Sequence, residues 1–201
     1  MTEGINMGII TKEVREIIEN EAIMTVYPIR EEDPETAELD EEIVRDYKES
    51  QYLFLQWLKE VYRPERILYA GSGDDGFPKQ IFGQEKVFHT SLEEYEPDRT
   101  KYFPRLGNGI KIVADNSRLP FPEKNFDLII TFCLFTETTA EQLKDMVRVL
   151  KTGGLVVCDN VVSQNIDLSQ VFADLKEMAV PDNFQQRGIS ETSFSVFKKV
   201  K

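Results

Sequence analysis

The sequence is poor in the residues that build most metal centres and covalent catalytic sites. Its 201 residues include a single histidine, His89, and only two cysteines, Cys133 and Cys158. A zinc site draws its ligands largely from cysteine and histidine, so this composition argues against one, although not against Mg²⁺ bound by carboxylates. Both cysteines lie in apolar runs, and we expect small buried core residues rather than a disulfide. We predict no metal site.

A long hydrophobic run is also missing. No stretch approaches the roughly 18 to 20 apolar residues that a membrane-spanning helix needs. Residues 1–17 have neither the basic start nor the apolar block of a signal peptide. We therefore expect a cytoplasmic protein with no membrane partner.

The chain lacks a cluster of basic residues. Its formal net charge is −12, and residues 31–42 hold eight acids and no lysine or arginine. Nucleic-acid binding usually requires a basic footprint, so this charge pattern argues against a nucleic-acid partner. Runs of like charge are usually solvated, and we interpret residues 31–42 as an acidic surface linker.

One short stretch organises the rest of the sequence. Residues 66–70 have the pattern of a buried strand, Gly71 and Gly73 favour a tight turn, and Pro78 suits the first turn of a helix. This order is typical of the first strand–loop–helix unit of an open α/β sheet, where ligands bind at the carboxyl ends of the strands. A glycine loop alone is weak evidence, because a plain strand-to-helix turn has the same sequence.

Short apolar runs alternate with helical patterns along the chain. Helices are expected at residues 12–22, at about 40–62, between the glycine turn and Gly83, at 139–150 and from Asp167 onward. Strands are expected at residues 66–70, 86–90, 110–114, 126–134, 155–159 and 193–200, the last of them antiparallel. This alternation predicts an α/β fold with a mainly parallel sheet. We divide the chain into an N-terminal helical extension with an acidic linker, residues 1–62, packed on a main domain, residues 63–201.

Several residues mark the ends and the buried faces of these helices. Thr11 is a candidate N-cap for the first helix, and Gly153 with Gly154 is expected to terminate the helix at 139–150. The helix at 40–62 repeats apolar residues at three- and four-residue steps, which predicts one buried face. That face includes Tyr47, Phe54, Leu55 and Leu58.

Three segments, taken in order, match the motifs of one enzyme class. They are residues 110–115 (IKIVAD), residues 119–130 (LPFPEKNFDLII) and residues 146–157 (MVRVLKTGGLVV). With the glycine stretch before them, they resemble the Rossmann-like S-adenosylmethionine-dependent methyltransferases, most closely those that methylate small molecules. The resemblance covers about residues 66–160. It implies three layers around a seven-stranded, mostly parallel sheet with an antiparallel strand.

The resemblance also implies a cofactor, S-adenosylmethionine, and roles for the matching positions. The glycine turn would lie against the methionine part, and Asp115 would accept a hydrogen bond from the adenine amino group. Residues 132–136 would line the reaction site. Each position also has a structural alternative: the glycines can serve only the turn, Asp115 can cap a turn, and Phe132 can belong to the core. The implied cofactor-binding residues are Gly71, Ser72, Gly73, Asp115, Asn116 and Phe132.

The sequence departs from the family pattern around the ribose and the methionine. Tyr69 stands where the family usually has an acid, and Asp75 replaces the third glycine. The acid that normally ends the second strand is missing, and Thr90 and Ser91 stand there. The sequence leaves open which acid takes over its role, the candidates being Asp74, Asp75, Glu93 and Glu94.

Two hypotheses of different kinds follow. The first is a methyltransferase that transfers the methyl group to an unidentified, small-molecule acceptor. Such a transfer depends on alignment and needs neither a metal nor a mandatory base. If the acceptor must lose a proton, the candidate bases are Glu137, Asp159 and His89. The alternative is a catalytically inactive methyltransferase-like domain that acts as a partner-binding or regulatory subunit, which the missing acids favour.

Overall fold

The computed structural model describes residues 11–12, 14–16, 18–19, 34–72, 77–91, 110–132, 140–159, 174–181, 184 and 194–201. The chain forms two compact units, residues 1–63 with 183–192, and residues 64–182 with 193–201. The expected division into residues 1–62 and 63–201 stays a prediction. None of the described helices is both long enough and apolar enough to cross a membrane.

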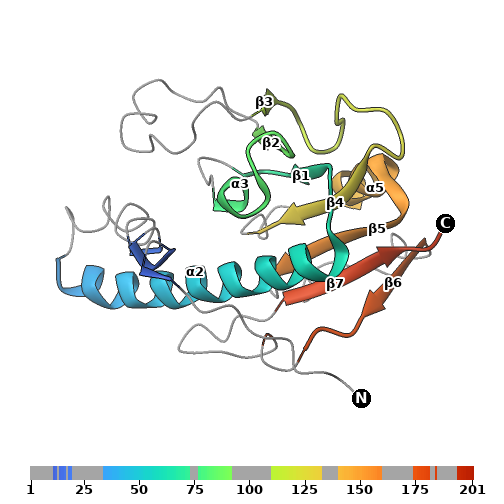
Figure 1. The fold of residues 1–201 in the computed structure, drawn as a ribbon. Coiled ribbons are helices and arrows are strands. Elements are labelled where there is room, and N and C mark those ends of the chain that lie inside the picture. The colour runs from blue at the N-terminus through green and yellow to red at the C-terminus, as the bar shows by residue number, and fades with distance from the viewer. Residues whose placement is uncertain are drawn as a thin grey trace, which may run out of the picture. The chain divides into compact units, whose positions relative to one another are not determined.

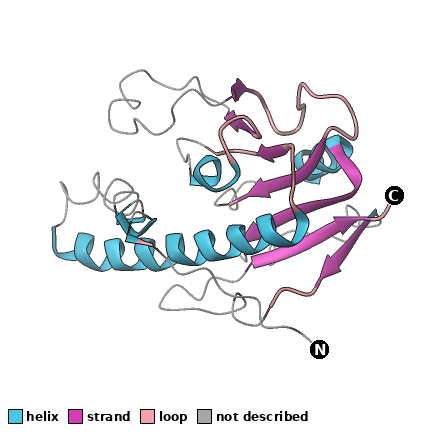
Figure 2. Ribbon diagram, viewed as in Figure 1, coloured by secondary structure: helices cyan, strands magenta, loops and turns pink. Residues whose placement is uncertain are grey.

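The larger unit is built on a seven-stranded sheet (Figures 1 and 2). Its strand order is β3-β2-β1-β4-β5-β7-β6. Strands β1 to β5 pair in parallel, and β7 is antiparallel to both β5 and β6. The strands are β1 Ile67–Tyr69, β2 Val87–Ser91, β3 Ile110–Val113, β4 Phe126–Thr131, β5 Leu150–Asp159, β6 Leu175–Met178 and β7 Phe194–Lys199. The expected fold class, a mostly parallel α/β sheet with an antiparallel strand, is confirmed.

The strand order reverses between β1 and β4, and this reversal determines where the helices lie. Helix α3 (Phe77–Phe82) connects β1 to β2, and helix α5 (Ala140–Val149) connects β4 to β5. Because parallel crossovers are right-handed, connections that run in opposite directions along the sheet cover opposite faces. Because β1 to β5 are parallel, their carboxyl ends share one edge of the sheet. An open α/β sheet binds its ligands at this edge, where the strand order reverses.

The face under α5 carries the main apolar core. Strand residues at alternate positions point to the same face, and here they meet the apolar stripe of the helix. The fully or nearly fully buried members of this cluster are Leu68, Ala70, Leu119, Phe126, Ile129, Leu143, Met146, Val149, Leu150 and Val156. This packing fixes α5 against the central strands.

Helix α5 ends at Val149, one residue before the expected end, and its last carbonyls are bound by the N–H groups of Lys124 and Asn125 and by Lys199 of β7. The Lys199 ammonium donates to the Val147 carbonyl at 2.6 Å and to the Leu150 carbonyl at 2.9 Å. These bonds satisfy carbonyls that the last turn of a helix leaves without intrahelical partners. Lys199 from β7 thus binds carbonyls at the helix end, where the sequence analysis expects a glycine C-cap.

Gly153 and Gly154 lie within β5, at a point where the pairing of that strand is irregular. The prediction that they terminate the preceding helix is therefore wrong. Phe126 pairs with Leu150, but Leu128 pairs with Leu155, so residues 151–154 bulge out of the ladder. Gly153 has φ of +84°, a conformation that side chains disfavour. A Cβ at Gly154 would lie 2.9 Å from the Lys151 carbonyl oxygen. Both glycines are therefore needed by the bulge.

The smaller unit contains the long helix α2, Pro34–Tyr62, which begins six residues before the expected start at 40. Proline suits the first position of a helix, and an acidic sequence favours its first turn. Much of the acidic run is therefore helix, where the sequence analysis expects a linker. The charge that suggests a solvated linker is the same charge that stabilises a helix start.

The predicted buried face of α2 is confirmed for Phe54, Leu55 and Leu58, which are fully buried, while Tyr47 is only partly buried. Phe184 packs within the same unit, with its ring centroid 5.8 Å from the rings of both Phe54 and Trp57.

Thr11 is confirmed as an N-cap. The Val14 N–H points to the Thr11 Oγ1 at 3.4 Å, and Lys12, 14–16 and 18–19 are helical.

The helix expected from Asp167 onward does not extend to Leu175. The expected helix from Asp167 falls largely on residues 160–173, which lie outside the described residues, but Leu175 belongs to β6 instead. Strand β6 is an edge strand whose pairing with β7 fixes it, with Leu175 opposite Lys199. The predicted closing strand is confirmed as β7.

Candidate functional site

The first candidate residues follow β1 at the carboxyl edge of the sheet. Gly71 has φ of +64°, the left-handed conformation that glycine adopts without strain, so the predicted turn is confirmed at this residue. The Gly71 N–H donates to Thr90 Oγ1 at 3.3 Å, and the Ser72 N–H donates to the Thr90 carbonyl at 3.0 Å. Ser72 is buried. Gly73, Asp74 and Asp75 lie outside the described residues.

Thr90 connects the ends of three neighbouring strands. Besides accepting from Gly71 after β1, its hydroxyl donates to the Asn116 Oδ1 after β3, at 3.0 Å. Thr90 is fully buried and Asn116 nearly so. A hydroxyl has one proton to donate, and here that proton goes to Asn116. Thr90 therefore organises the edge of the sheet from within and presents no free donor to a ligand.

Asp115 lies at the same edge with its carboxylate exposed. Its Oδ1 accepts from the Ser117 N–H at 2.8 Å, and its carbonyl accepts from the Arg118 N–H at 2.9 Å. Two hydrogen bonds from Ser117 lower the pKa of Asp115: the one from its backbone N–H has the larger effect, and one from its side chain adds to it. The turn-capping alternative is thus observed, but Asp115 also stays ionised at neutral pH and exposed, as a hydrogen-bond acceptor for a ligand must be.

Phe132 follows β4 and is buried under the edge. Its ring centroid lies 5.6 Å from that of Phe194 and 6.3 Å from that of Tyr69. Tyr69, which stands in the place of a family acid, is 2% exposed and also packs on His89 at 5.5 Å. In this structure these four rings form an aromatic layer, and the role of Phe132 in cofactor binding stays a prediction.

Of the three candidate bases, the structure describes His89 and Asp159. His89 is fully buried within the aromatic layer, and Asp159 is buried at the carboxyl end of β5. Glu137, like Glu93 and Glu94, lies outside the described residues. Cys158 is buried as expected, and burial, followed by the charges of Asp159 and Glu177, raises the pKa of its thiol to about 12. Cys133 lies outside the described residues.

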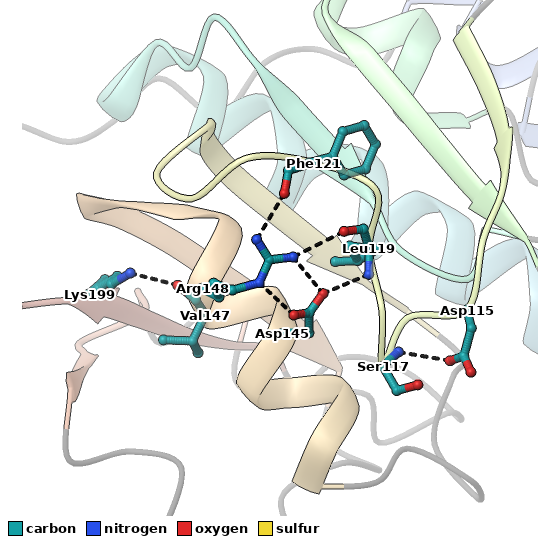
Figure 3. A network of polar contacts seen from close by, with 8 residues as sticks. All are labelled: Asp115, Ser117, Leu119, Phe121, Asp145, Val147, Arg148 and Lys199. Atoms are coloured by element: carbon teal, nitrogen blue, oxygen red, sulfur yellow. Dashed lines mark hydrogen bonds and ion pairs between the residues drawn. The ribbon is translucent and has the colours of Figure 1, made fainter.

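The connection from β3 to β4 is held by an ion pair on α5 (Figure 3). Asp145 accepts from the Leu119 N–H at 2.6 Å through Oδ2. Arg148 donates to the Phe121 carbonyl at 2.8 Å and to the Leu119 carbonyl at 3.0 Å. Between the two side chains, Nε lies 2.6 Å from Oδ1 and a terminal guanidinium nitrogen lies 2.9 Å from Oδ2. We call Asp145 and Arg148, with these five bonds, the α5 clamp.

The electrostatics of the α5 clamp are those of a tight ion pair. Burial alone would raise the pKa of Asp145, but the hydrogen bonds from Arg148 and from the Leu119 N–H outweigh it and lower that pKa. The same bond to Asp145 raises the pKa of Arg148. The pair is fully charged at neutral pH.

The comparisons with known proteins agree on the fold. Residues 68–158 match the model of a protein family described as a methyltransferase domain. The family resemblance is confirmed. The matched residues extend over β1 to β5. No curated protein sequence matches the chain.

Solved structures that cover about three quarters of this chain share its fold at low identity. The N-methyltransferase NodS from Bradyrhizobium japonicum is 17% identical, with a TM-score of 0.58, covering 79% of this chain and 97% of its own. The PH0226 protein from Pyrococcus horikoshii is 16% identical, with a TM-score of 0.56 and coverages of 75% and 90%. The [4+2]-cyclase SpnF is 12% identical, with a TM-score of 0.52 and coverages of 74% and 81%. At this identity the likeness concerns the fold alone.

At the opposite edge of the sheet, Asp127 has a structural role. Its Oδ2 accepts from the N–H groups of Arg66 at 2.9 Å and Glu65 at 3.2 Å, just before β1. Its Oδ1 lies 2.6 Å from the Lys151 ammonium. Burial would raise the pKa of Asp127, but the bonds from Lys151 and Arg66 lower it. Asp127 lies at the amino ends of the strands, away from the candidate site.

The sequence analysis missed two parts of the site, the bridging role of Thr90 and the α5 clamp. A threonine in the place of the family acid is noticeable in the sequence, but its bonds depend on how β1 and β3 lie beside β2. An acid followed three residues later by an arginine predicts an ion pair on a helix. Nothing in that spacing indicates that the pair also holds a loop 26 residues away.

Proposed function

We propose that this protein is an S-adenosylmethionine-dependent methyltransferase that acts on a small-molecule acceptor. The observation that carries the proposal is the arrangement of the carboxyl edge, where the Gly71–Ser72 turn and the Asp115 loop are joined through Thr90. Two neighbouring loops thereby present a left-handed glycine turn and an exposed, ionised carboxylate at the position where open α/β sheets bind ligands.

The described residues fit part of the cofactor. The exposed Asp115 carboxylate can accept a hydrogen bond from the adenine amino group, and Asn116 lies beside it. Gly71 has no side chain to obstruct the methionine part. When bound, S-adenosylmethionine supplies a methyl group on a sulfonium, which an acceptor nucleophile displaces. The chain itself contributes binding and alignment, which can account for much of the rate of such a displacement.

Thr90 favours a second candidate, a methyltransferase-like domain without catalytic activity that binds a partner or regulates one. A neutral, fully buried threonine stands where the family holds the ribose hydroxyls with an acid. The similar structure titled a [4+2]-cyclase supports the idea that this fold also serves proteins with another activity. Ribose binding then requires an acid from elsewhere in the chain, and without one the cofactor site is incomplete.

Titration calorimetry of S-adenosylmethionine and S-adenosylhomocysteine tests the proposal. We expect the wild type to bind both, and Asp115→Ala to weaken binding about five- to 150-fold, since a ligand donor loses its acceptor. Glu141→Ala, which removes an exposed acid from α5, is the matched control and should bind as the wild type does. No heat and no thermal shift for the wild type at millimolar ligand would refute the enzyme and favour the second candidate. Binding that ignores Asp115→Ala would refute the position assigned to the adenine.

A further inference from the structure

The segment that directly follows Asp115 is held at two points. At one end Asn116 is bonded to Thr90, and at the other the α5 clamp binds the backbone of Leu119 and Phe121. Only two residues, Ser117 and Arg118, lie between these attachments, and the N–H groups of both donate to Asp115. A shift of Leu119 therefore passes through two hydrogen-bonded residues to the exposed carboxylate.

The loop does not depend on the clamp to stay folded. Leu119 is 3% exposed and belongs to the core cluster under α5. The Phe121 ring lies 4.8 Å from the ring of Phe126 and 6.1 Å from that of Phe88, edge to face in both cases. These apolar contacts keep the loop packed on the sheet. The polar bonds of the α5 clamp then set the exact position and orientation of its backbone.

The chemistry of the clamp suits such a role. The rigid, planar guanidinium of Arg148 reaches two carbonyls and one carboxylate at the same time, as a lysine ammonium on a flexible stem does not. The bonds are short and charge-assisted, so they define a position more tightly than neutral bonds do. Three backbone groups of the loop are bound in this way, two carbonyls by Arg148 and one N–H by Asp145.

We propose that Asp145 and Arg148 are positioning residues of the cofactor site: through Leu119 they hold Asp115 where it meets the adenine. The inference rests on the proposed function, because it assigns the clamp to the binding of that cofactor. Neither residue touches the cofactor in this proposal. Their effect is on its affinity, and it passes through the loop.

The test compares Asp145→Asn with a matched control, Asp127→Asn. Both acids accept backbone N–H groups and pair with a cation, but Asp127 pairs with Lys151 and binds the residues just before β1, not the segment that follows Asp115. We expect Asp145→Asn to weaken S-adenosylhomocysteine roughly five- to 30-fold in calorimetry, and Asp127→Asn less than about twofold. Hydrogen exchange at the amides of residues 116–119 should be faster in Asp145→Asn than in the wild type or in the control.

Arg148→Lys tests the role of the planar guanidinium directly, since this substitution keeps the positive charge. We expect it to weaken the ligand in the same range as Asp145→Asn and to loosen the same amides. Wild-type affinity in this variant would overturn the role given to the guanidinium.

The outcomes separate the inference from the proposed function. Equal loss of affinity in Asp145→Asn and Asp127→Asn would point to general destabilisation and overturn the inference, as would unchanged exchange at residues 116–119. If the wild type binds neither ligand, the proposed function fails, and with it the assignment of the clamp to a cofactor. Faster exchange confined to Asp145→Asn would then still support the positioning of Asp115.

Discussion

Thr90 shows how one buried hydroxyl can replace a charged ligand-binding group and serve the fold instead. It accepts from Gly71 and donates to Asn116, so it links three strand ends that the chain separates by up to 45 positions. In a buried site, each bond left unmade is costly, because water cannot replace the lost partner. The residue therefore fixes the geometry of the edge even if it never contacts a ligand.

Thr90→Val keeps the shape of the side chain and removes both bonds. We expect the free energy of unfolding to fall by about 1 to 3 kcal/mol, because the Gly71 N–H and the side-chain Oδ1 of Asn116 lose their partner. Urea denaturation measures this fall. The matched control is Thr90→Ser, which keeps the hydroxyl, and the Gly71 amide should exchange hydrogen faster in the valine variant than in the serine variant. Equal exchange in the two variants would contradict the bridging role.

At the scale of single elements, helix α2 buries four large apolar side chains between residues 54 and 58. Phe54, Leu55 and Leu58 are completely buried, and Trp57 is nearly so. Val61, one turn after Trp57, is 48% exposed. The helix therefore offers both a buried and an exposed aliphatic side chain within four residues, which makes a matched pair of truncations possible.

Leu58→Ala should lower the free energy of unfolding by about 2 to 5 kcal/mol, through lost burial and the cavity left behind. Val61→Ala is the control and should change it by less than about 0.5 kcal/mol, since the site is exposed. Chemical denaturation of both variants measures the difference. A midpoint that Leu58→Ala leaves unchanged would show that the packing of α2 contributes little to stability.

Elements with a strong apolar pattern could be predicted from the sequence, and those fixed by their neighbours could not. Residues 126–131 and 194–199 are apolar or alternating, and both are strands as predicted. Strand β6 has the sequence LKEM, whose two central residues are charged and exposed, so only its pairing with β7 makes it a strand. The end of α5 likewise depends on Lys199, which comes from 50 residues further along the chain.

The same distinction applies to the candidate site. The turn at Gly71 and the acceptor Asp115 follow from local residue types, and the structure shows the glycine in the left-handed conformation and the carboxylate exposed. The bonds of Thr90 and of the α5 clamp join segments that are distant in the sequence. Their partners are set by the order and register of the strands, which the local pattern does not contain.

On the scale of the whole molecule, two carboxylates with lowered pKa values make folding sensitive to acid. The folded-state pKa values of Asp127 and Asp145 lie below the usual value of 3.8. Their stabilising bonds are therefore fully present above pH 4 or so, and are lost as the pH falls through the lower, folded-state values. The Asp127 pair joins β4 to β5 and the Asp145 pair holds the connection from β3 to β4, so acid weakens the domain at both places.

We expect the free energy of unfolding of the wild type to fall steeply below about pH 4. The double variant Asp127→Asn with Asp145→Asn should be less stable at pH 7 and should show a flatter dependence in this range, since both titrating groups are gone. Urea denaturation between pH 7 and pH 3 measures both curves. Parallel curves for the two proteins would mean that other acids dominate the pH dependence.

Strand β7 has a consequence for the order in which the domain can form. It lies between β5 and β6 in the sheet, yet it is the last of the seven strands in the chain. During synthesis on the ribosome, β6 therefore emerges without its hydrogen-bonding partner, and the outer side of β5 stays open. Phe194 and Val196, both buried in the finished fold, arrive only then. The sheet is completed by insertion rather than by growth at its margin, so the nascent chain exposes two unpaired strand edges until β7 emerges.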